Sequence, residues 1–145
     1  MRCVRELDLM NKMPELIWNE HEVIECLGVL PETEEFFSSH YFRLTKNELL
    51  LEITIWQYES FIAVSISKET DKEPFITLYF IVRDIVEFVS AKDFSSLKFR
   101  NCVIVSNEFW MFEEDEKNNY FDKDKFPTEL DIELCIYPKL KLNFD

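Results

Sequence analysis

The sequence predicts a mainly β fold at the margin of α+β: an antiparallel meander sheet, sandwich-like or partly closed into a barrel, with one N-terminal helix. Apolar and polar residues alternate with a period of two over most of the chain after Pro31, as in half-buried strands. Helical character is concentrated before that point. The length of 145 residues and the 47% hydrophobic content favour a single globular domain over residues 1–145.

The helix is expected over residues 14–27. Pro14 suits the first helical position, and Gly28, the only glycine in the chain, is placed to end the helix in a left-handed cap. Asn19 is an alternative N-cap, from which a shorter helix would start. A further helix over 85–93 is the α+β alternative to a strand in that region.

Strands are expected wherever the alternation holds. In residues 48–56, for example, Leu51, Ile53 and Ile55 fall on one face of a strand, and Asn47 before them can adopt the left-handed conformation of a hairpin turn. Residues 75–82 are apolar on nearly both faces, which indicates the middle of the sheet. The expected strands cover residues 41–44, 48–56, 60–67, 75–82, 85–89, 97–105, 130–136 and 140–144, the last as an edge strand guarded by lysines.

Between Glu108 and Asp124 the composition changes. This stretch contains seven acidic residues and only two lysines, and the pair Asn118 and Asn119 is typical of a turn. We expect an exposed loop.

The net charge limits the classes of partner. With 29 acidic and 16 basic side chains the formal charge is −13, which opposes binding to nucleic acids and to anionic membranes and favours a basic protein partner. The segment Met1–Pro14 has no continuous apolar core and so does not resemble a signal peptide or a membrane span. We therefore expect a cytoplasmic protein.

The scarcity of glycine excludes several kinds of active site. Phosphate-binding loops, dinucleotide fingerprints and nucleophile elbows need glycine where the backbone turns left-handed or approaches a ligand closely. One glycine cannot supply them, and we expect no cofactor.

Metal and thiol sites are weakly supported. His21, Glu22, Glu25 and Cys26 could share the helix, but a zinc-protease helix needs a second histidine at the position of Glu25. Asp122 and Asp124 lack the residue order of a calcium loop. A thiol enzyme would require an unpredicted contact, Cys26 with His40 or Cys3 with His21. We expect no metal or catalytic residues, and we expect Cys102 and Cys135 to be buried, reduced thiols.

Aromatic residues beside acidic segments are the best binding candidates, because such side chains anchor interfaces. They include Trp56, Tyr58 and Phe109, although core packing is the commoner role of such rings. The sequence favours a non-catalytic acidic module that binds a basic protein, including an immunity-type inhibitor of a cationic toxin or nuclease. The expected contact residues are Trp110, Phe112, Glu113, Glu114, Asp115 and Glu116.

Three other functions stay open. Fourteen phenylalanines would permit a carrier of a small apolar ligand in an aromatic-lined β-barrel. Scattered carboxylates could converge into an enzyme site. An aromatic sheet face could also form a homodimer.

Overall fold

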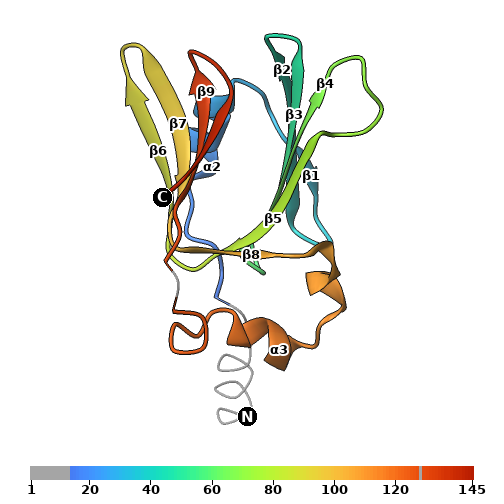
Figure 1. Ribbon diagram of the computed structural model, residues 1–145, viewed down its shortest axis with the longest axis vertical. Helices are drawn as coiled ribbons and strands as arrows, with labels where there is room; N and C mark the ends of the chain where they lie inside the picture. Colours follow the sequence, from blue (N-terminus) through green and yellow to red (C-terminus); the bar gives the residue numbers. More distant parts are fainter. Residues whose placement is uncertain (1–13, 128) are drawn as a thin grey trace.

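The computed structural model describes residues 14–127 and 129–145 and places two antiparallel sheets opposite each other (Figure 1). The first sheet has the order β1-β2-β3-β4-β5-β8, and the second has the order β10-β9-β7-β6. The mainly β, sandwich-like prediction is confirmed, and the described strands do not close into a barrel. The elements are α2 (Glu20–Leu27), β1 (Glu32–Glu34), β2 (Ser39–Lys46), β3 (Leu49–Trp56), β4 (Phe61–Lys68), β5 (Ile76–Val82), β6 (Val86–Ala91), β7 (Phe94–Phe99), β8 (Cys102–Val105), the 3-10 helix η1 (Asn107–Met111), α3 (Glu114–Asn119), β9 (Ile132–Tyr137) and β10 (Lys141–Phe144).

The helix α2 is shorter than the 14–27 span expected from the sequence. Asn19 is the N-cap, and its side chain accepts the backbone N–H of Glu22 at 3.2 Å. The residues before Asn19 are not helical. The backbone N–H of Leu16 instead donates a hydrogen bond to the Gln57 carbonyl at 2.7 Å. At the other end Gly28 adopts the predicted left-handed cap, with φ 73°.

Residues other than glycine make the remaining left-handed turns of the described chain. Asn47 has φ 54°, as predicted, and Glu48 beside it has φ 68°, which gives the tight β2–β3 hairpin. The other non-glycine residues with positive φ in the described ranges are Ser38, Ser60 and Asn101. The single glycine therefore does not prevent sharp reversals.

The main core lies between the two sheets and includes one side of α2. Leu51, Ile53 and Ile55 of β3 are fully buried on the face that the alternation predicted. The helix adds Val23, Cys26 and Leu27 and packs against β6 and β7. The other fully buried side chains of this core are Phe42, Ile62, Phe80, Leu97, Phe99, Ile132 and Leu134.

The strand expected over 97–105 is broken in two. Asn101 adopts φ 57°, and its N–H bonds to the Asp131 carboxylate at 2.9 Å. The chain turns there, so β7 stays in the second sheet while β8 joins β5 in the first. As a result β5 is next to the edge strand and is not in the middle of the sheet. Residues 86–91 form the strand β6, so the alternative helix over 85–93 is wrong.

The acidic segment 108–124 is not the exposed loop that its composition indicates. It contains η1 and α3, and Phe109 within it is fully buried. These helices cover the outer face of the first sheet, where Phe61, Ile81 and Phe109 form a second apolar cluster. The molecule therefore has a partial third layer at one end of the first sheet (Figure 1).

Among the residues that the structure describes, no helix has the length and apolar content needed to cross a membrane. The expectation for Met1–Pro14 falls, except for Pro14 itself, on residues outside the described ranges, and so does the expectation for Cys3.

Candidate partner-binding surface

The segment from Asn107 to Asn119, here called the η1–α3 segment, is fixed to the sheet by one buried ring. The Ser106 side chain caps η1 by accepting the Glu108 N–H at 3.2 Å. Phe109 then points inward and stacks on Phe61 of β4, with ring centroids 5.3 Å apart. Because Phe109 is fully buried, the segment is held by burial of a whole aromatic side chain.

The residues next to Phe109 present apolar surface to solvent. Trp110 is 37% exposed and meets Trp56 edge to face, with centroids 5.0 Å apart. Met111, which the sequence reasoning did not single out, is 82% exposed. Phe112 is half-buried and packs against Phe109 and Tyr120, so it supports the segment more than it projects from it.

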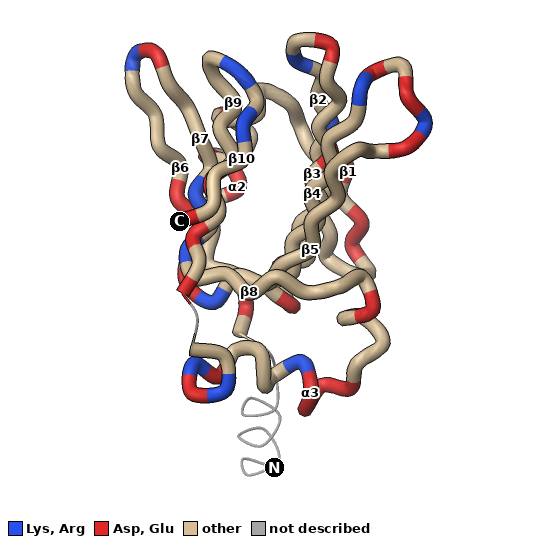
Figure 2. The backbone as a smooth tube through the Cα atoms, in the orientation of Figure 1, with Lys and Arg blue, Asp and Glu red and all other residues tan. Residues whose placement is uncertain are grey.

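The expected acidic contact residues lie in the first turn of α3 and at its N-cap. All are exposed, and Figure 2 shows this stretch as a run of acidic positions beside α3. Their position is physically favourable, because the N-terminus of a helix carries partial positive charge. None of the ion pairs between described residues involves these side chains, which are Glu113, Glu114, Asp115 and Glu116.

Lys117 is the one basic residue of the η1–α3 segment, and it turns toward the aromatic rings. Its Nζ lies 5.3 Å from the Trp110 ring centroid and 5.7 Å from that of Phe109. These are cation–π distances. In this position the Lys117 ammonium lies against the rings that hold the segment to the sheet.

The chain after α3 is anchored as well. Tyr120 stacks on Phe126 with centroids 4.5 Å apart, and Arg83 donates to the Phe126 carbonyl at 2.6 Å. The same guanidinium bonds to the Asn101 side chain at 2.6 and 3.1 Å. The end of the acidic segment is thereby tied to the corner where β7 passes into β8.

The set proposed on the N-terminal helix does not come together. His21, Glu22 and Glu25 are exposed, whereas Cys26 is buried. His40 does not pair with Cys26 but contacts the Trp18 ring and bonds to the Gln57 side chain at 2.8 Å. No group of acidic, histidine or cysteine residues in the described ranges has the geometry of a metal site.

The described cysteines are buried and free. Cys102 and Cys135 lie in strands as expected, and burial raises the pKa of Cys26 and of Cys102 to about 12. At neutral pH these thiols are protonated and poorly nucleophilic.

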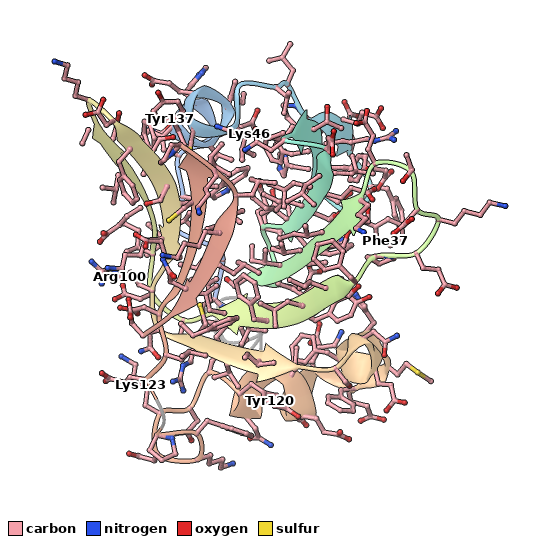
Figure 3. All side chains as sticks on the ribbon, turned by 45° about the horizontal axis from the view of Figure 1, so that its top comes forward. Phe37, Lys46, Arg100, Tyr120, Lys123 and Tyr137 are labelled. Carbon is pink, nitrogen blue, oxygen red and sulfur yellow. The ribbon has the colours of Figure 1, made fainter. Side chains whose placement is uncertain are left out.

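A groove lies between the sheets, beside the end of α2. Its volume is about 790 Å³, and its walls come from α2, β2, β3, β7 and β9. Lys46 lies 4.8 Å from the centroid of the Tyr137 ring, so a contact between the two sheets borders the groove (Figure 3). The lining contains no carboxylate, and Tyr137 is its only aromatic residue. It therefore differs from both the aromatic barrel and the carboxylate cleft that the alternative functions require.

The fold and this surface define an acidic, two-sheet antiparallel β protein with a helical segment on one outer face. No known family model matches the chain, and no curated protein matches it. In structure the chain is similar to a chain of the contact-dependent growth inhibition toxin–immunity protein complex from Klebsiella pneumoniae 342. The TM-score is 0.65 at 12% sequence identity, and the match covers 92% of this chain and 98% of that one.

Proposed function

We propose that this chain is a non-catalytic module that binds a basic protein partner, and that it acts as an immunity-type inhibitor of a cationic toxin or nuclease. The observation that carries the proposal is the likeness to a component of a toxin–immunity protein complex over 92% of the chain. Because the match covers nearly all of both chains, the similarity extends over both sheets and is not limited to one common motif.

The charge of the chain supports this choice of partner. A formal charge of −13 attracts a basic protein and raises the rate of encounter. A nuclease uses lysine and arginine to hold phosphates. Carboxylates such as Glu114 and Asp115 would compete for the same side chains, and so the partner's substrate would be excluded.

The η1–α3 segment supplies both kinds of contact that such an interface uses. None of the ion pairs between described residues involves its carboxylates, so a cation that binds them breaks none of those pairs. Trp110 and Met111 add apolar surface beside them. The buried Phe109 holds the surface in place before the partner arrives, which reduces the entropy lost on binding.

A cytoplasmic location fits the same function. An inhibitor of a nuclease has to act where nucleic acids are, and the buried thiols of Cys26 and Cys102 are compatible with a reducing compartment.

The proposal is tested by isolating the partner from the native source. The tagged chain is expected to retain one basic protein at a fixed stoichiometry. Expression of that protein alone is expected to arrest growth, and co-expression of this chain is expected to restore it. Recovery of no stoichiometric partner, or of a partner whose toxicity the chain does not relieve, would contradict the function.

A further inference from the structure

We propose that the turn between β1 and β2 is a second anchor for the same basic partner, in which Phe36 and Phe37 insert into an apolar hollow rimmed by lysine or arginine. This inference rests on the proposed function and adds to it a contact surface outside the η1–α3 segment.

The two rings are unusually exposed. Phe36 is 84% exposed and Phe37 is 60% exposed, and neither belongs to the two apolar clusters of the described chain. They touch each other, edge to face, with centroids 4.8 Å apart. Burial of a phenylalanine ring among apolar side chains is favourable, and these two rings forgo that stabilisation in the free chain.

The turn that carries the rings is ordered by its own hydrogen bonds. The Glu34 carboxylate accepts the backbone N–H of Phe36 at 3.1 Å and that of Phe37 at 2.7 Å. Ser38 closes the turn with φ 49°, and its N–H bonds to the Glu35 carbonyl at 3.2 Å. The backbone that carries the rings is therefore ordered before docking, which lowers the entropic cost of binding.

The acidic side chains around the turn favour a partner with a basic surface. Glu32, Glu34 and Glu35 are exposed beside the rings. No lysine or arginine occurs from Val29 to Phe42, which includes β1, the turn and the first half of β2, or from Ile53 to Val64, which includes the paired ends of β3 and β4. An apolar pair flanked by Glu32, Glu34 and Glu35 is complementary to an apolar hollow with a basic rim.

The same charges disfavour a second copy of this chain as the occupant. Two identical turns meeting at a two-fold axis would bring Glu34 and Glu35 of each copy close to those of the other. Each copy also carries a formal charge of −13. Repulsion between the copies opposes that dimer.

The turn lies at the same end of the first sheet as the η1–α3 segment. Ser39, the first residue after the turn, is in register with Trp56 of β3, and Trp56 contacts Trp110. Figure 3 shows Phe37 on the flank of the first sheet that faces away from β7 and β9. One partner could therefore contact both surfaces while leaving the second sheet free.

The test compares a double substitution in the turn with the substitution of an exposed phenylalanine elsewhere on the same sheet. Phe36→Ser with Phe37→Ser removes the aromatic pair, and Phe75→Ser removes a ring that is 57% exposed near the start of β5, at the opposite end of the sheet. Binding of each variant to the basic partner recovered from the native source is measured by calorimetry. Circular dichroism and thermal melting establish that both variants keep the wild-type fold.

We expect the double variant to raise the Kd about 30-fold, as loss of a hot-spot anchor does, and the Phe75→Ser variant to change it less than about threefold. Equal Kd values for the double variant and the wild type would overturn the second anchor while leaving the proposed function intact. Sedimentation showing a dimer that the double variant abolishes would also overturn it, in favour of a second copy. If no partner binds the wild type, the proposed function and this inference both fall.

Discussion

Phe61 of β4 and Phe109 of η1 stack face to face, with ring centroids 5.3 Å apart and planes within 2° of parallel. Both rings are fully buried, although Phe61 lies on the outer face of the first sheet. Through this contact the acidic η1–α3 segment is packed against the first sheet. The position of the candidate binding surface depends on it.

Replacing Phe109 by alanine is expected to lower the free energy of unfolding by about 3–5 kcal/mol, as for other buried phenylalanines. The ring loses its contacts with Phe61, and Trp110 and α3 lose their anchor. Urea denaturation measures the change. Met111→Ala is the control, because Met111 is 82% exposed, and it should shift the free energy by no more than about 0.5 kcal/mol. Equal effects of the two substitutions would contradict the packing described.

Gly28→Ala is expected to destabilise the protein by about 1–2 kcal/mol, the cost of placing an L-residue in the left-handed region. The cause is conformational, because Gly28 has φ 73° and a Cβ there would meet nothing within 4 Å. Gly28→Asn should cost less, since asparagine tolerates this region better. Equilibrium denaturation of both variants provides the comparison, and an alanine variant as stable as the wild type would refute the cap.

Asp131 is expected to make the free energy of unfolding depend on pH in the acidic range. Hydrogen bonds from the Asn101 backbone N–H and from Arg100 hold the pKa of Asp131 below its usual range. A depressed folded-state pKa contributes stability above the unfolded value, about 3.9, and that contribution is lost as the pH falls through the folded value. The gap in unfolding free energy between the wild type and Asp131→Asn should therefore be widest at neutral pH and should shrink below about pH 4. A gap independent of pH would show that Asp131 is not ionised in this role.

Cys26 and Cys102 should resist alkylation in the folded protein. Burial raises the pKa of both thiols to about 12, so little thiolate is present at about pH 8. Mass spectrometry after a short treatment with iodoacetamide should find both residues unmodified in buffer and fully modified in concentrated guanidinium chloride. Rapid modification in buffer would show that one of them is accessible.

The alternation of apolar residues predicted the strands well where one face is buried throughout. β3, β4 and β9 follow it closely, because Leu51, Val64 and Leu134 each face the same core. The end of α2 was also predictable, since Gly28 was the only glycine available for a left-handed cap. Local chemistry determined these features.

The errors arose where contacts distant in sequence decide the structure. The break at Asn101 depends on Asp131 and Arg83, which approach it only after folding. Phe109 and Phe112 repeat at a spacing of one helical turn behind a Ser106 cap, and this signal could have revealed η1 within the acidic segment. The adjacent rings of Phe36 and Phe37 in an acidic stretch were likewise visible in the sequence.

The central claim, that the acidic first turn of α3 contacts a basic partner, is tested most directly by a matched pair of triple variants. One carries Glu114→Gln, Asp115→Asn and Glu116→Gln. The other carries the same change of charge at exposed positions in the β4–β5 loop: Glu69→Gln, Asp71→Asn and Glu73→Gln.

The measurement is the rate of association of each variant with the partner from about 50 to 500 mM salt. We predict that the α3 variant associates at least about tenfold more slowly at low salt and depends less on salt, and that the loop variant stays near the wild type. Equal rates for the two variants would contradict the account, because the charge of the chain would then act without the surface on α3.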